Sequence, residues 1–237
     1  MASDDFRFKR FTVRHDRCAM KVGTDGVLLG TWADVAHAGT ILDIGAGSGL
    51  VALICAQRSN AMITAVEIDD EAAAQAAENA AGSPWKDRIA VVHSSIEEFA
   101  AASGQHFDAI VSNPPYFENS YKAKGERRNL ARHADMLTPD DLARHAAALL
   151  ADGGSFSCIL PAEEECTFAD RAEKEGLHLR RKTMVLPREG AEPKRVLFVF
   201  RRQQCNASVS SLAILKRDSN EATEEYKNLT RDFYLNF

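Results

Sequence analysis

The sequence predicts an α/β fold: a doubly wound, mostly parallel sheet of seven strands with helices on both faces, in which the last two strands form an antiparallel pair. Short apolar runs alternate with helical segments between residues 40 and 175, and this alternation is typical of parallel βαβ units. The last two apolar runs, residues 177–186 and 195–202, have no helix between them, so we expect them to pair antiparallel. The composition of 45% hydrophobic and 27% charged residues is that of an ordinary globular protein.

Five strands are expected before the antiparallel pair, each as a short apolar run. They fall at residues 40–44, 62–68, 88–93, 107–112 and 155–160. Each run is bounded by turn residues and separated from the next by a segment with helical spacing. Such runs are typical of strands that are buried in the middle of a parallel sheet.

The helices are expected from the signals at their ends. Asp69 and Asp70 open an alanine-rich segment that Gly82 follows, and acids at the start with glycine after the end are typical of helices. Thr138 and Pro139 open another helix with the pattern of a capping box and a proline at the first helical position. Further helices are expected over residues 50–58, from about residue 96, over 162–175 and over 221–234.

Length and composition bound the organisation of the protein. A chain of 237 residues with 7 prolines fits a single domain over residues 1–237. There is no uncharged apolar stretch of 18 residues and no apolar core of a secretory signal at the N-terminus. We therefore expect a cytoplasmic protein without a membrane segment. The five cysteines form no C-x-x-C pair and the seven histidines are scattered, so we expect no metal.

Charge is distributed unevenly along the chain. The 29 Lys and Arg against 34 Asp and Glu give a net charge of −5, which argues against a general polyanion-coating protein. Three segments are nevertheless basic: residues 7–21 (+5), 122–133 (+4) and 178–202 (+6). An acidic body with basic segments can bind nucleic acid locally, and the alternative is that these segments are ordinary solvated faces.

A glycine-rich motif follows the first regular strand and opens a helix. Its sequence is DIGAGSG over residues 43–49, and position 50 is leucine where a dinucleotide-binding fingerprint requires glycine. The spacing therefore favours a nucleoside cofactor over a pyrophosphate, with a plain strand-to-helix turn as the alternative. The residues expected to line the cofactor here are Asp43, Gly45, Ala46, Gly47 and Gly49.

An acidic residue strengthens this interpretation. Glu67 follows Gly45 by 22 residues and ends the second strand, where a carboxylate can accept hydrogen bonds from both ribose hydroxyls. Asp43 lies at the mouth of the same site. A carboxylate there suits a ligand with positive charge, such as the ammonium and sulfonium groups of S-adenosylmethionine, and suits the phosphates of NAD poorly.

A third motif, Asn113-Pro114-Pro115-Tyr116, comes directly after the fourth strand. The prolines end the strand because neither can donate to a ladder. An amine conjugated to a base is a poor nucleophile, since its lone pair is delocalised. The Asn113 oxygen and the Pro114 carbonyl can each accept an N–H from such a nitrogen and aim its lone pair at a methyl group, while Tyr116 offers a face for stacking.

These motifs together resemble the class I S-adenosylmethionine-dependent methyltransferases that modify amino or amide nitrogen. More narrowly, the chain resembles the bacterial valine-tRNA (adenine-N(6))-methyltransferases, which methylate the adenosine immediately 3′ of the anticodon. The similar segments are FTVRHDRCAMKVGTDGVLLG over residues 11–30, residues 42–50, SPW over 83–85, residues 112–116 and LTRDFYL over 229–235. They extend from about residue 6 to the C-terminus, and the first and last are far more specific than the glycine loop.

The resemblance implies an enzyme with S-adenosylmethionine as cofactor and assigns further residues to its site. Residues 1–35 would cover the cofactor and the substrate. Ile68 would pack on the adenine ring, and Thr24 would cap a helix starting at Asp25 whose N-terminus holds the methionine carboxylate. Ser95 stands where this class commonly has an aspartate that bonds to the adenine amine. Lys21 and Ile96 complete the expected cofactor site.

The basic segments gain a role if the substrate is an anticodon stem-loop of tRNA. Residues near the substrate entrance and in the last strand turn would contact its phosphates, with strong salt dependence. They are Arg127, Arg128, Arg132, Lys194 and Arg195. Other readings remain open: methylation of rRNA guanine N(2), DNA adenine or protein glutamine, an RNA-binding module without catalysis, and a nicotinamide oxidoreductase.

Overall fold

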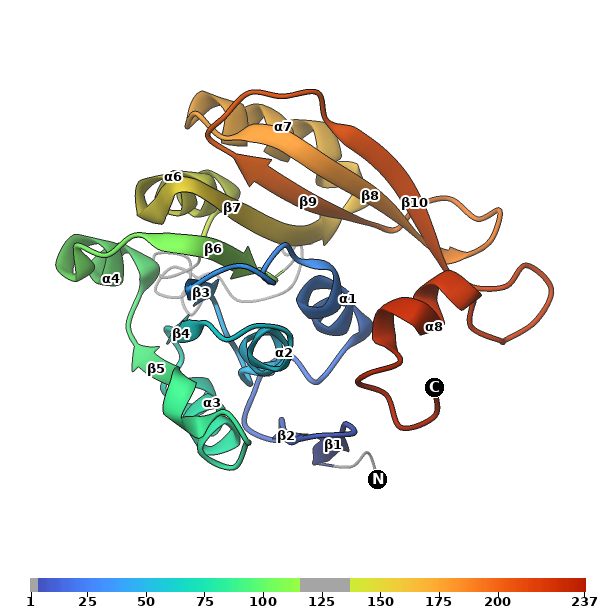
Figure 1. Cartoon of the computed structure of the whole chain (residues 1–237), viewed down its shortest axis with the longest axis horizontal. Helices are drawn as coiled ribbons and strands as arrows, with labels where there is room; N and C mark the ends of the chain where they lie inside the picture. Colours follow the sequence, from blue (N-terminus) through green and yellow to red (C-terminus); the bar gives the residue numbers. More distant parts are fainter. Residues whose placement is uncertain (1–3, 116–136) are drawn as a thin grey trace, which may run out of the picture.

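The computed structural model describes residues 4–115 and 137–237, and within them one sheet of eight strands organises the molecule (Figure 1). The strand order is β10-β8-β9-β7-β6-β3-β4-β5. The strands are β3 (Thr40–Ile44), β4 (Met62–Glu67), β5 (Ile89–His93), β6 (Phe107–Ser112), β7 (Leu150–Pro161), β8 (His178–Arg188), β9 (Arg195–Arg201) and β10 (Ser208–Leu215). A separate two-stranded sheet pairs β1 (Asp5–Arg7) with β2 (Thr12–Arg14).

The strand directions confirm the predicted fold class. β3 pairs parallel with β4 and β6, β4 with β5, and β6 with β7. β9 runs antiparallel to both β7 and β8, which is the expected antiparallel pair. The sheet has one strand more than the seven expected, because β10 adds in parallel to β8. The first four residues of β10, SVSS over 208–211, are exposed at the sheet edge, and its apolar run is limited to LAIL over 212–215, so the sequence signal for this strand is weak.

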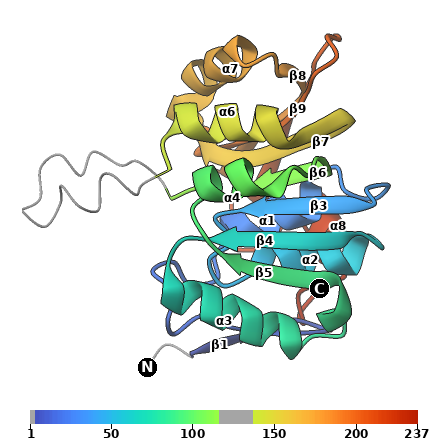
Figure 2. The same cartoon turned by 90° about the vertical axis from the view of Figure 1, so that its left-hand side faces the viewer.

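Helices cover both faces of the sheet, and each face has its own apolar core (Figures 1 and 2). One core contains the buried side chains of α1, α2 and α8 together with the N-terminal aromatic residues. The other contains those of α6 and α7, with α4 packed beside them. The helices are α1 (Thr24–Trp32), α2 (Leu50–Arg58), α3 (Asp70–Ala81), α4 (Ile96–Ser103), α6 (Pro139–Leu149), α7 (Glu165–Lys174) and α8 (Glu224–Thr230).

The expected helix signals correspond to observed caps. The Asp69 carboxylate accepts a hydrogen bond from the Ala72 amide at 2.9 Å, and the Thr138 hydroxyl accepts one from Asp141 at 3.1 Å. The last helix is shorter than the stretch 221–234. Thr223 is its N-cap, and Ala222 bridges to the end of β10 before the helix begins.

Two glycines let α1 and α2 pack closely. A Cβ atom on Gly30 would lie 2.8 Å from the Cβ of Ile54, and one on Gly26 would lie 2.9 Å from the Leu50 Cδ2. Both contacts are shorter than packed carbon atoms allow. The G-x-x-x-G spacing in the N-terminal segment is therefore a requirement of helix packing.

We expect Gly30→Ala to lower the free energy of unfolding by about 1–3 kcal/mol, because the added methyl must displace the stiff, branched Ile54 side chain. Urea unfolding would measure the change. Gly82→Ala is the matched control: its Cβ would meet nothing closer than 3.4 Å at a φ of −79°, so a change within about 0.5 kcal/mol is expected. Equal losses in both variants would contradict the packing argument.

Candidate cofactor and catalytic site

The carboxyl ends of β6, β3 and β4 lie side by side and bring the predicted motifs together. In the register of the sheet, Ile44 is opposite both Val66 and Ser112. The buried Ser112 hydroxyl donates to the Ile44 carbonyl at 2.9 Å and ties the two strand ends directly. After β3 the chain continues to β4 and β5 on one side of β3, and it then returns to place β6 on the other side. This edge is therefore the switch point where doubly wound sheets bind ligands.

The glycine loop has the backbone conformation that its sequence predicted. Gly45, Gly47 and Gly49 have φ angles of +71°, +53° and +78°, which favour glycine. No atom lies within 4 Å of the positions that a Cβ would take on Gly45 or Gly47, so both face open space that a nucleoside can approach closely. The amides of Gly45 and Ala46 both donate to the Val66 carbonyl, at 2.9 and 3.1 Å, which fixes the loop on β4.

Glu67 links the glycine loop to the start of α3. Its Oε2 accepts from the Gly47 amide at 2.7 Å and its Oε1 from the Asp69 amide at 3.0 Å. The side chain is 9% exposed. Each carboxylate oxygen has a further lone pair, so the same group can hold the loop and accept ribose hydroxyls.

Asp43 is buried beneath the glycine loop at the N-terminus of α2. Gly49, the N-cap residue of α2, has no side chain to cap it, and Asp43 Oδ2 instead accepts from the Ala52 amide at 3.0 Å. The pKa of Asp43 is raised to about 7, chiefly because the carboxyl is buried; the Ala52 hydrogen bond lowers the pKa and the charge of Glu67 raises it, and the value is the net of all three effects. Asp43 therefore changes its charge near neutral pH.

Three residues are expected around an adenine ring, and they differ in exposure and in hydrogen bonding: Ile68, Ser95 and Ile96. Ile68 is a large apolar side chain that is 44% exposed next to Glu67, as a ring-packing residue would be. Ser95 is the N-cap of α4, where its hydroxyl accepts from the Glu98 amide at 3.1 Å within a capping box. This hydroxyl has one lone pair left for an adenine amine. Ile96 packs against the core under α4.

The helix near Thr24 differs from the expectation. Thr24 is the first residue of α1, its N-cap is Gly23, and no side chain caps the helix, so the expected cap by Thr24 is wrong. The backbone of Gly23 is extended and places Thr24 one residue too late for a cap. Asp25 instead pairs with Arg195 from the start of β9, with Nε to Oδ2 at 3.0 Å. Lys21 is exposed just before this helix.

Asn113 and Pro114 follow β6 at the same edge. Asn113 is half-buried, and its Nδ2 is 3.8 Å from the position of a Cβ on Gly26. The amide nitrogen is thus the end that faces α1. Pro114 is buried and Pro115 exposed. Tyr116, Arg127, Arg128 and Arg132 lie outside the described residues.

The sequence named Asn113, Asp25 and Arg195 as site residues but did not show how they are placed. The closeness of Asn113 to Gly26 and the ion pair of Asp25 with Arg195 join segments that are far apart in the chain. The signal for the first is the pair of glycines four residues apart in a segment of helical spacing. No signal in the sequence indicates the second, because it depends on β9 lying next to β7.

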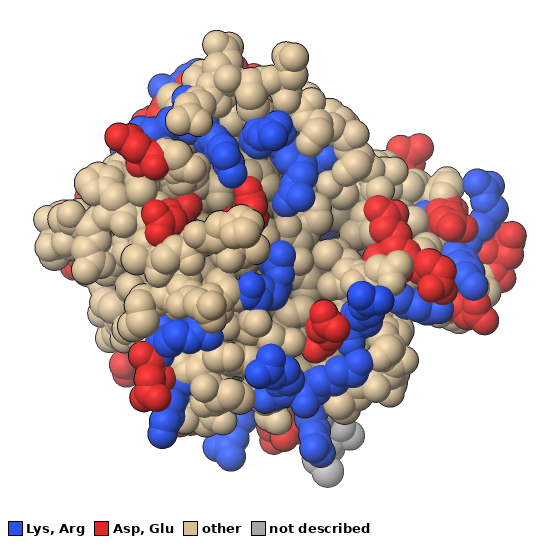
Figure 3. Space-filling view, viewed as in Figure 1, with Lys and Arg blue, Asp and Glu red and all other residues tan. Residues whose placement is uncertain are grey.

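Basic side chains gather in two regions of the face shown in Figure 3, one over β1 and β2 at its lower end and one near β8 and β9 at its upper end.

Among residues 4–115 and 137–237 there is no group of three or more His, Cys, Asp and Glu side chains arranged for a metal ion. In the same part of the chain, no helix has the length and apolar character needed to cross a bilayer.

Comparison with known proteins identifies the family. The chain matches the model of the methyltransferase small domain over residues 19–167. It is 51% identical over 236 residues to the tRNA1(Val) (adenine(37)-N6)-methyltransferase of Phocaeicola vulgatus, covering 100% of both chains. A relative with the same name from Trichodesmium erythraeum is 44% identical over 240 residues, again covering 100% of both. The chain belongs to the tRNA1(Val) (adenine(37)-N6)-methyltransferase family.

Solved structures of other methyltransferases share the fold of this family member. A predicted O-methyltransferase from Agrobacterium tumefaciens superposes with a TM-score of 0.68 at 22% identity, covering 88% of this chain and 96% of that one. The glycopeptide N-methyltransferase MtfA, solved with S-adenosylmethionine, superposes with a TM-score of 0.55 at 14% identity, covering 77% and 100%. The doubly wound methyltransferase architecture is therefore confirmed.

The buried carboxyl of this methyltransferase should make its stability depend on pH. Because the pKa of Asp43 rises from 3.8 to about 7 on folding, the folded state holds a proton that the unfolded state loses between these values. The free energy of unfolding should fall as pH rises from about 4 to 7, by on the order of 3 kcal/mol from this group. Urea unfolding at a series of pH values would measure it.

Asp43→Asn supplies the control, since its amide oxygen can still accept from Ala52 and does not titrate. The difference in stability between the native protein and this variant should change across the same pH range. A constant difference would show that Asp43 is ionised throughout.

Proposed function

We propose that this chain transfers a methyl group from S-adenosylmethionine to the N6 amine of adenosine 37 in valine tRNA, at the carboxyl edge of β6, β3 and β4. The observation that supports it is the meeting of Asn113 and Pro114 with the glycine loop and Glu67 at one switch point, in a chain 51% identical to a tRNA1(Val) (adenine(37)-N6)-methyltransferase.

The residues at this edge fit the cofactor. Gly45 and Gly47 leave open space where any other residue would place a Cβ, and Glu67 presents two carboxylate oxygens to the ribose. Above a pH of about 7, where Asp43 is ionised, it supplies negative charge beneath the loop for the positive end of the ligand. When bound, S-adenosylmethionine supplies an electrophilic methyl group on its sulfonium sulfur.

The role of Asn113 and Pro114 is to bind and orient a weak nucleophile. The N6 lone pair of adenine is delocalised into the ring, so the amine is planar and weakly nucleophilic. Asn113 Oδ1 and the Pro114 carbonyl accept its two N–H groups, which favours tetrahedral geometry and directs the lone pair toward the methyl group. The Asn113 nitrogen faces Gly26, so its oxygen is directed away from α1. Positioning and electrostatics of this kind need no strong base.

Recognition of the anticodon stem-loop belongs to the same proposal. Arg195 begins β9 opposite Pro161, at the carboxyl end of β7, and Lys194 precedes it as an exposed residue. Both are therefore on the edge that contains the catalytic motif. Arg195 already pairs with Asp25, so we propose that it contacts a phosphate with part of its guanidinium while it anchors α1.

The experiment is methylation of an unmodified valine-tRNA transcript with isotopically labelled S-adenosylmethionine, followed by nucleoside analysis by mass. N6-methyladenosine at position 37 is the expected product. A transcript with guanosine at position 37 is the matched control and should gain no label. Methylguanosine as the product, or label in the control transcript, would overturn the proposed substrate.

Asn113→Ala should lower kcat about 100- to 1,000-fold, because one preorganised polar acceptor is lost, and should leave the Kd for S-adenosylmethionine within about threefold. Single-turnover methylation and calorimetry would separate the two effects. Asn60→Ala, an exposed asparagine before β4 at the opposite edge of the sheet, is the control and should behave like the native protein. Full activity of Asn113→Ala would remove the assigned role.

A further inference from the structure

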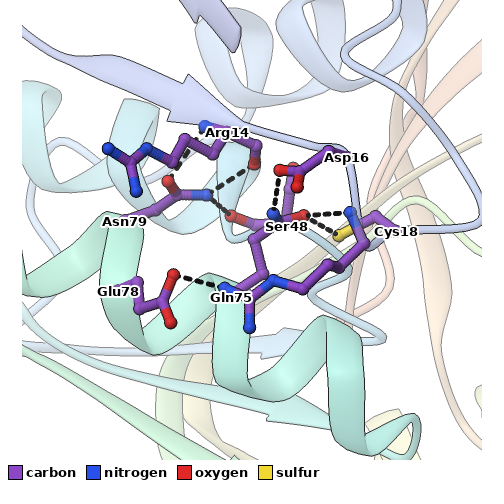
Figure 4. A network of polar contacts seen from close by, with 8 residues as sticks. Arg14, Asp16, Cys18, Ser48, Gln75, Glu78 and Asn79 are labelled. Atoms are coloured by element: carbon purple, nitrogen blue, oxygen red, sulfur yellow. Dashed lines mark hydrogen bonds and ion pairs between the residues drawn. The ribbon is translucent and has the colours of Figure 1, made fainter. Parts of the chain in front are cut away.

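Two amide side chains on one face of α3 are buried outside the motifs described so far. Gln75 and Asn79 are one helical turn apart and are 0% and 5% exposed. A buried amide is costly unless its hydrogen bonds are satisfied. Figure 4 shows that both point toward the N-terminal segment where it crosses the helix.

Asn79 joins three parts of the chain. Its Oδ1 accepts from the Arg14 amide at 2.9 Å, while its Nδ2 donates to the Arg14 carbonyl at 2.8 Å and to the Ser48 carbonyl at 2.9 Å (Figure 4). The three partners are one backbone N–H and two backbone carbonyls, so they determine which end of the amide is the oxygen. They also satisfy the hydrogen bonds of this buried side chain with backbone groups. Asn79 thus connects β2 of the N-terminal segment to the glycine loop through α3.

Within residues 4–115 and 137–237, the hydrogen bonds of the Gln75 side chain go to the N-terminal segment. Its Oε1 accepts from the Arg17 amide and from the Cys18 thiol, both at 3.1 Å, and its Nε2 donates to Asp16 Oδ1 at 2.6 Å. Outside these buried bonds, Glu78 forms an exposed ion pair with Arg17. The segment is therefore held to α3 by two buried amides, and the exposed charge pair beside them contributes little.

The segment held in this way is connected to the proposed ribose acid through the glycine loop. Asn79 bonds both to Arg14 and to the Ser48 carbonyl, and the neighbouring Gly47 amide donates to Glu67 Oε2 at 2.7 Å. The pKa of Cys18 in this segment is raised to about 11, mainly by burial and further by the charges of Glu67 and Asp69. The stretch from Arg14 to Cys18 is thus fixed to the loop that Glu67 holds, on the side where Glu67 would bind the ribose.

We infer that Asn79 is a positioning residue for cofactor binding: it fixes the N-terminal segment and the glycine loop to each other, so that the segment covers the ribose side of the site. This inference rests on the proposed function for the identity of the cofactor. Gln75 holds the same segment through hydrogen bonds to residues 16–18 rather than to the loop. Because Asn79 also bonds to the loop, substitutions of the two amides should have different effects on cofactor binding.

How firmly the N-terminal segment is held against α3 can be measured without cofactor, from the rate at which N-ethylmaleimide alkylates Cys18. Peptide mass analysis supplies internal controls, since Cys166 and Cys205 are exposed while Cys55 and Cys158 are buried. Asn79→Ala and Gln75→Met each remove hydrogen bonds without adding charge. Both should speed the alkylation of Cys18 about tenfold or more, because a loosened thiol regains its ordinary pKa and exposure.

Cofactor binding separates the two amides. Asn79→Ala should raise the Kd for S-adenosylmethionine about tenfold, while kcat at saturating cofactor stays within about threefold because Asn113 and Pro114 are untouched. Gln75→Met should raise this Kd less than about threefold, since it leaves the Ser48 contact intact. Glu78→Gln breaks only the exposed ion pair and should change neither Kd nor alkylation, as such pairs contribute little.

A native Kd and a native alkylation rate in Asn79→Ala would overturn the inference, and so would equal rises in Kd for Asn79→Ala and Gln75→Met. If Asn79→Ala does not fold by circular dichroism, Asn79→Ser replaces it with the same expected outcomes. Failure of the native chain to bind S-adenosylmethionine would overturn the proposed function instead, and the alkylation measurements would still decide whether the amides hold the segment.

Discussion

The site depends on the parallel pairing of β3 with two neighbours at once. Residues of β3 such as Ile41 and Leu42 are fully buried, so the strand is pinned between β4 and β6 with both faces covered. A shift of one residue in either register would turn a whole strand over. The pairing of Ile44 with Val66 and with Ser112 therefore determines that Glu67, the last residue of β4, and Asn113, the first residue after β6, lie at the same edge of the sheet.

Two carboxylates beneath and beside the glycine loop make this edge electrostatically costly without a ligand. Asp43 and Glu67 lie close enough for Glu67 to raise the pKa of Asp43, and both carboxylates accept hydrogen bonds from backbone amides. A ligand with ammonium and sulfonium groups would reduce this repulsion, whereas an anionic one would increase it. The choice of a cationic cofactor thus follows from the same burial that holds the loop in place.

Sequence patterns predicted those parts of the molecule that depend on local chemistry. The glycine loop, the acid that ends β4 and the caps of α3 and α6 each depend on a few adjacent residues, and the structure places them together. Patterns failed where a distant neighbour decides. β10 is a strand because β8 offers it an edge, and Asn79 stands in the sequence as one of several polar residues in an alanine-rich helix. The error at Thr24 is local, because the helix begins one residue earlier than expected, with Gly23 as its N-cap.

The residues just before the first of the two most specific segments, Phe8 and Lys9, meet the C-terminal residues in space. β1 and β2 have three residues each, too few for a stable hairpin alone. Lys9 donates to the carbonyls of Arg231 and Phe237 at 2.5 and 2.7 Å, and Phe8 stacks near Tyr234 with ring centres 6.0 Å apart. The C-terminal residues thus anchor one side of the N-terminal segment and α3 anchors the other. Because neither anchor is local, the position of the segment beside the cofactor loop depends both on α3 and on the C-terminal residues.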